Sequence, residues 1–138
     1  MQLFSLEQIH NKVIHFPIAL LSTSVLFDLI GFYSDNKKMY STSWYLLILG
    51  TLSALSAVLT GFIADETQGH MSEPFPIFTT HGSTQIFASL LFLSLLIWRY
   101  VNIRTETKPT FVYLVASIAG ILILFYGGHL GAVIAGRI

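Results

Sequence analysis

Residues Phe111–Leu130 read FVYLVASIAGILILFYGGHL, twenty residues without one charged side chain. A run of about 20 apolar residues can cross a hydrocarbon core about 30 Å thick as an α-helix. Three further, predominantly apolar runs precede it, at Val13–Phe32, Ser43–Ile63 and Gly82–Val101. Because these four spans occupy most of the 138 residues, the sequence predicts a single transmembrane domain over residues 1–138. Short loops between successive spans favour an all-α, integral membrane four-helix bundle with up-down-up-down topology.

The overall composition excludes several classes of function. Hydrophobic residues make up 54% of the chain and charged residues only 10%, whereas a soluble domain carries about 25% charged residues. The formal net charge of zero leaves no basic surface for nucleic acid. The absence of cysteine excludes disulfides, thiolate metal sites, iron–sulfur clusters and covalently attached c-type haem. Because hydrolase, nucleotide-binding and zinc-protease motifs are missing, we do not expect an enzyme that acts on a soluble substrate.

The distribution of basic residues predicts how the chain is oriented in the membrane. Four spans place both termini and the 64–81 loop on one side, and the 33–42 and 102–110 loops on the other. Most of the basic residues lie on the second side: Lys37, Lys38, Arg99, Arg104 and Lys108. Since Lys and Arg accumulate on the cytoplasmic side, we expect a multi-pass protein of the bacterial inner (cytoplasmic) membrane with its N- and C-termini outside.

All five histidines of the chain fall on the predicted outer side. Three of them, His15, His81 and His129, lie at the ends of different spans, with their Cα atoms within roughly 5 Å of one another in depth. Neutral imidazole is the commonest metal ligand in proteins, so three helices that each supply one at matched depth predict a metal or haem site. We interpret His70, in the outer loop, as a solvated residue.

Two imidazoles from different helices can clamp a haem iron from both faces. We expect haem b with His15 and His81 as the axial pair, with His129 as the leading substitute and His10 next. On a continuous helix His10 and His15 diverge by about 140°, so they address one metal only if the chain bends between them. An open copper or zinc site of His15, His81 and His129 is the alternative. Aromatic residues near this end favour haem: Phe16, Phe62, Phe87, Phe125 and Tyr126.

Small residues recur at helical spacing in the second and fourth spans. Such stripes are typical of helices that pack closely in lipid, and clearance for a flat cofactor is a second interpretation. The stripes consist of Gly50, Ala54, Ala57 and Gly61, and of Ala116, Gly120, Gly127 and Gly131.

Asp28 is the only acidic residue within the spans. An unpaired carboxylate is costly in a membrane, and Arg99 near the same end of the third span is its expected partner. We favour an orienting ion pair over a proton relay or a quinone contact.

The stretch from His10 to Leu20, HNKVIHFPIAL, is similar to the His-Pro-x-x-Val-His-Phe-Pro-Ile-Ala-Leu signature of a family of predicted bacterial membrane proteins of unknown function, the DUF2231 type. Asn11 replaces the usual proline, and Ala135-Gly136 stands where many members have His-Gly. The resemblance implies a four-helix membrane protein, and some members resemble fusions to, or neighbours of, periplasmic c-type cytochromes. Further matching positions are Asp28-Leu29, Thr60-Gly61, Asp65, His81, Gly127-Gly128 and Leu130.

Three hypotheses about function follow. The first is a membrane b-type cytochrome-like electron-transfer subunit that binds haem near the periplasmic face and is not itself catalytic. Its partners would be the lipid bilayer, a periplasmic c-type cytochrome or another redox subunit, and quinol as a candidate donor. The second is a cofactor-free membrane anchor or scaffold, and the third is an outward-facing histidine metal site. An oligomer is compatible with all three.

Overall fold

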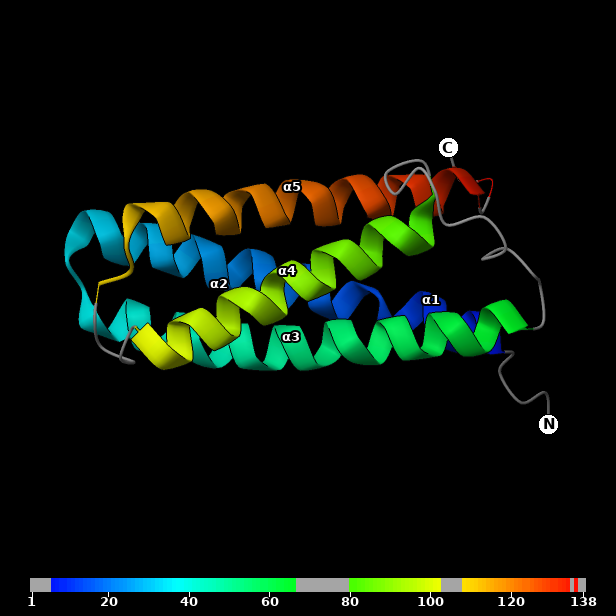
Figure 1. The fold of residues 1–138 in the computed structure, drawn as a ribbon, viewed down its shortest axis with the longest axis horizontal. Helices are drawn as coiled ribbons and strands as arrows, with labels where there is room; N and C mark the ends of the chain where they lie inside the picture. Colours follow the sequence, from blue (N-terminus) through cyan, green and yellow to red (C-terminus); the bar gives the residue numbers. More distant parts are fainter. Residues whose placement is uncertain (1–5, 67–79, 103–107, 135, 137–138) are drawn as a thin grey trace.

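The computed structural model describes residues 6–66, 80–102, 108–134 and 136 of the chain. These residues form five α-helices (Figure 1). Four of them are long and apolar enough to cross a membrane, which confirms the predicted spans. The helices are α1 (Leu6–Val13), α2 (His15–Ser34), α3 (Lys37–Glu66), α4 (His81–Asn102) and α5 (Phe111–Ile134).

The helix ends differ from the predicted ends most clearly at α3, which begins at Lys37, six residues before the predicted Ser43. Asp35 adopts a left-handed conformation (φ 53°) and its N–H donates to the Gly31 carbonyl, which ends α2. The Asn36 side chain then accepts from the Lys38 N–H at 3.0 Å and caps the new helix. The predicted 33–42 loop is therefore a tight turn, because hydropathy marks where apolar residues begin and not where a helix begins.

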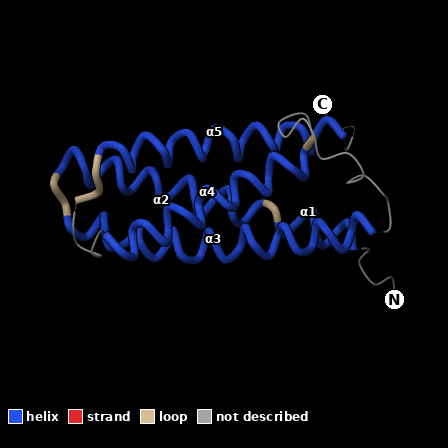
Figure 2. Tube along the Cα trace, viewed as in Figure 1, coloured by secondary structure: helices blue, strands red, loops and turns tan. Residues whose placement is uncertain are grey.

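The four long helices lie side by side along one axis, with successive helices antiparallel (Figure 1). α2 packs against α3, α3 against α4, α4 against α5, and α5 against α2, which closes the predicted up-down-up-down bundle. α1 packs against α3 and contacts α2. Figure 2 shows the short break at residue 14 that separates α1 from α2. One end of the bundle thus carries α1 and the end of α5, and the other carries the α2–α3 turn.

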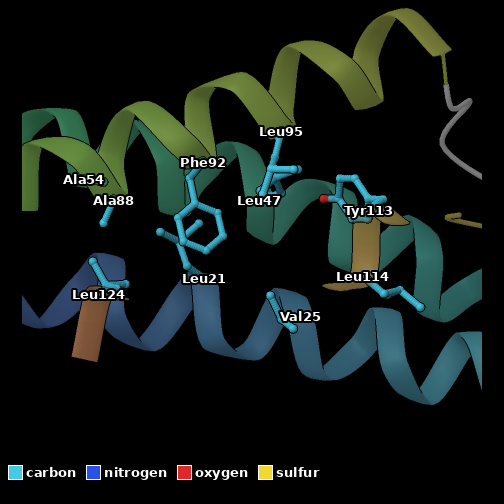
Figure 3. Packing of buried hydrophobic residues seen from close by; sticks show 10 residues of the cluster. All are labelled: Leu21, Val25, Leu47, Ala54, Ala88, Phe92, Leu95, Tyr113, Leu114 and Leu124. Carbon is cyan, nitrogen blue, oxygen red and sulfur yellow. The ribbon is translucent and has the colours of Figure 1, made fainter. Parts of the chain in front are cut away.

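The core of the bundle is a cluster of buried apolar side chains from α2, α3, α4 and α5 (Figure 3). Leu21 and Phe92 at its centre are fully buried. Two glycines of the predicted stripes let these side chains approach: a Cβ at Gly50 would lie 2.7 Å from Leu21 Cδ2, and one at Gly120 would lie 3.0 Å from the Phe92 ring. These two positions serve helix packing, as small residues do in lipid.

Large apolar side chains also cover the outside of the bundle. Leu26, Leu59 and Leu122 are all more than half exposed. Such a surface would be unstable in water and is the one expected for helices that face acyl chains. The chain is therefore a multi-pass membrane protein in a lipid bilayer.

Candidate functional site

His81 is the first residue of α4 and its side chain is half-buried against α5. Its Nδ1 lies 2.6 Å from the backbone carbonyl oxygen of Gly127. A carbonyl only accepts hydrogen bonds, so Nδ1 carries the proton and donates it. When the ring is neutral, the lone pair is then on Nε2, which is the form of imidazole that binds a metal.

His10 reaches the same place from α1. Its Nδ1 lies 3.0 Å from the hydroxyl oxygen of Thr60 on α3. That hydroxyl also lies 3.0 Å from the Ala57 carbonyl. When it donates its single proton to that carbonyl, it accepts from the imidazole, and His10 then carries its proton on Nδ1 and presents an Nε2 lone pair. Thr60 and the Gly127 carbonyl thus place an oxygen atom beside Nδ1 of each ring.

The two rings lie close together at the end of the bundle that carries α1. Their centroids are 6.5 Å apart, and their planes cross at 73°. Two metal–nitrogen bonds of about 2 Å each, with about 1 Å from each nitrogen to its ring centre, span about 6 Å. The distance between the two ring centres is therefore close to that of two imidazoles bound to one metal ion.

Glycine at two positions allows both rings to lie against neighbouring helices. A Cβ on Gly61 would lie 3.1 Å from His10 Cε1. A Cβ on Gly131 would lie only 2.7 Å from both Cε1 and Nδ1 of His81, closer than real Cβ atoms approach. The outer ends of the two small-residue stripes therefore accommodate the histidine pair, whereas their inner parts accommodate core side chains.

The other predicted ligands do not join this pair. His15 is the first residue of α2, directly after the break, and its side chain is exposed. His129 on α5 is exposed as well. Over the described residues, no group of three or more histidine, aspartate or glutamate side chains that could hold a metal is present. His70 lies outside the described residues.

The aromatic side chains predicted to line a cofactor lie on the outer surface. Phe16 is 62% exposed and Phe125 50%, and Phe62, Phe87 and Tyr126 are also exposed. These rings belong to the surface that faces lipid.

Sequence reasoning missed Thr60 and the Gly127 carbonyl, which orient the two rings. Both positions stand in matched motifs, Thr60-Gly61 and Gly127-Gly128. Their place in the family resemblance was the one signal in the sequence that could have drawn attention to them. A backbone carbonyl carries no mark in a sequence, so its role required coordinates.

A second polar cluster lies at the opposite end of the bundle. Arg99 Nη1 lies 2.6 Å from Asp28 Oδ2, and both side chains are almost completely buried, which confirms the expected pairing. Arg99 also donates to the Ser43 hydroxyl at 3.1 Å and to the Tyr40 carbonyl at 2.9 Å. The Tyr113 hydroxyl accepts a longer bond of 3.4 Å. One cation on α4 thereby ties together α2, α3 and α5.

The apolar core separates the two polar clusters. Phe92 and Leu95 lie between His81 and Arg99 along α4, and Leu47 lies between Ser43 and Thr60 along α3. A relay of protons between the two ends would have to cross this layer. The arrangement supports the interpretation of the ion pair as a device that orients helices.

Comparison with known proteins gives one match. A family whose description reads "Predicted membrane protein (DUF2231)" matches residues 7–138. No curated protein and no solved structure matches the chain.

Proposed function

This chain belongs to the DUF2231 family of predicted membrane proteins, and we propose that it is a b-type cytochrome-like electron-transfer subunit. In this proposal His10 and His81 would hold the iron of haem b. One observation carries the proposal: the ring centres of two imidazoles from different helices lie 6.5 Å apart, and an oxygen atom lies within hydrogen-bond distance of Nδ1 of each ring.

The chemistry of the donor set fits haem iron. Two neutral imidazoles are common axial ligands, and an acceptor on the remote nitrogen raises the basicity of the ligating one. Thr60 would hold the His10 ring and the Gly127 carbonyl would hold the His81 ring in that form. When bound, haem supplies one-electron chemistry, while the protein supplies ligation and orientation. The subunit would pass electrons and would not transform a substrate by itself.

The location of the pair suggests the partner. We assign the end with α1 to the periplasmic side of the bacterial inner membrane, with both termini outside, because Lys37, Lys38 and Lys108 lie at the other end. A pair at this end is accessible to a soluble periplasmic c-type cytochrome. We infer that such a protein, or another redox subunit, exchanges electrons with it.

A copper or zinc ion on the same pair is the second candidate, because the 6.5 Å ring separation fits a single ion without a macrocycle. In that case the protein would handle a metal at the outer face. Water would complete the coordination of such an ion.

Optical spectroscopy and elemental analysis of the same purified sample separate these candidates. We expect a Soret band, and an alpha band that sharpens on reduction, from protein purified in detergent after expression with ample haem. Stoichiometric copper or zinc without a Soret band would favour the metal site. Absence of haem and of metal would refute both and leave a membrane anchor or scaffold.

A further inference from the structure

An open groove lies on the outer surface between α3 and α4, in the half of the bundle that contains the buried ion pair. Its volume is about 320 Å³ and its lining is wholly apolar, at the lower end of the range of about 300–1,000 Å³ for sites that hold small molecules. The lining residues are Trp44, Ile48, Leu96, Ile97 and Tyr100.

The groove lies at the depth where acyl chains begin. Trp44 and Tyr100 form its end nearest the α2–α3 turn, and their rings are stacked with centroids 6.4 Å apart. Trp and Tyr prefer the boundary between headgroups and hydrocarbon. Ile97, on the side away from that turn, is 56% exposed to the surroundings of the bundle. The hollow therefore opens toward lipid chains just inside the boundary.

A lysine is placed where the headgroup of a lipid in this groove would lie. Along α3, Trp44 lies seven residues after Lys37 and Ile48 lies eleven residues after it. These spacings place the three residues within about 40° of one another around the helix axis. Lys37 is exposed and lies about 10 Å beyond Trp44 along the helix axis. A cation just outside the hydrocarbon attracts anionic headgroups.

We propose that the groove holds one acyl chain of an anionic phospholipid, with Lys37 binding the phosphate. The lipid belongs to the leaflet at the α2–α3 end, and its site does not depend on the histidine pair. Such a lipid would fill the hollow between α3 and α4 and cover the stacked rings.

Native mass spectrometry of the detergent-purified full chain tests this proposal. The probes are phosphatidylglycerol and phosphatidylcholine with identical acyl chains. We expect the protein to retain phosphatidylglycerol about fivefold better than phosphatidylcholine. Both headgroups contain a phosphate, but only that of phosphatidylglycerol has a net negative charge, and one lysine near such a charge supplies about this difference. Lys37→Gln should abolish this preference. Lys38→Gln also removes one positive charge, but Lys38 lies about 100° further around the helix. This control variant should keep the preference for phosphatidylglycerol.

A second pair of variants tests the groove itself. Ile97→Trp fills the hollow and should lose both lipids, whereas Leu122→Trp changes an exposed side chain on α5 and should bind as the parent does. Circular dichroism establishes that each variant is folded. Equal losses for Lys37→Gln and Lys38→Gln, or full retention by Ile97→Trp, would overturn the proposal. The proposal is also overturned if the parent protein is a dimer and Ile97→Trp dissociates it, because a second copy of the chain would then fill the groove.

Discussion

Replacement of Arg99 by methionine should destabilise the bundle strongly. The substitution preserves an apolar stem but leaves the Asp28 carboxylate buried without the cation that lies 2.6 Å away. Removing one partner of a buried ion pair costs about 3–5 kcal/mol. The free energy of unfolding should fall by that amount.

The double variant Asp28→Leu/Arg99→Met should be more stable than the single Arg99→Met variant. It removes both charges, so no carboxylate remains unpaired. What is lost is the donor to Ser43, Tyr113 and the Tyr40 carbonyl, and each hydrogen bond contributes only about 0.5–1.5 kcal/mol. The three bonds together contribute about 1.5–4.5 kcal/mol, but replacing a buried ion pair by apolar residues is often neutral or stabilising by about 1–4 kcal/mol. We therefore expect a smaller net loss than that of the single variant.

Reversible unfolding in mixed micelles, followed by circular dichroism, measures these differences. Lys108→Gln is the control, because Lys108 pairs with Asp35 at 3.7 Å on the exposed surface, and such pairs contribute less than about 1 kcal/mol. The reasoning is refuted if Arg99→Met costs no more than the control, or if the double variant is less stable than the single one.

Two further predictions concern the residues that position the rings. Gly131→Ala should displace the His81 ring, because the new Cβ would lie 2.7 Å from ring atoms. Gly128→Ala is the control, because its Cβ would lie 3.7 Å from the nearest atom. The haem or metal content of the purified protein should fall for Gly131→Ala only, and equal content in the two variants would contradict the assigned packing. Thr60→Val removes the hydroxyl beside His10 Nδ1 and should weaken metal binding about 10–100-fold. Thr60→Ser keeps a hydroxyl and should bind metal as the parent does. Equal affinities of the parent and both variants in a metal titration would show that Thr60 does not orient the ring.

The fold follows from sequence patterns to a large extent. α5 begins at Phe111, the first residue of its predicted span, and α4 begins at His81, one residue before the predicted Gly82. The expected partner of Asp28 was correct, because only Arg99 lies at a matching depth on another span. α3 begins at Lys37, before the predicted Ser43. Hydropathy missed its first turns because they are polar, and Asn36 caps them.

The site was harder to predict, because depth along a helix is readable from sequence and rotation around it is not. His15 has the depth expected of a ligand, but its side chain is exposed. α1 ends one residue before α2 begins, and it packs against α3 with the His10 ring near that of His81. Side-chain contacts between helices decide this rotation, and hydropathy does not encode them.

The haem content of four alanine variants tests the central claim most directly. We expect His10→Ala and His81→Ala to lose the Soret band of the purified protein, whereas His15→Ala and His129→Ala, which change exposed histidines, should keep it. The opposite pattern, with haem retained in both His10→Ala and His81→Ala, would contradict ligation by the pair that the helices bring together.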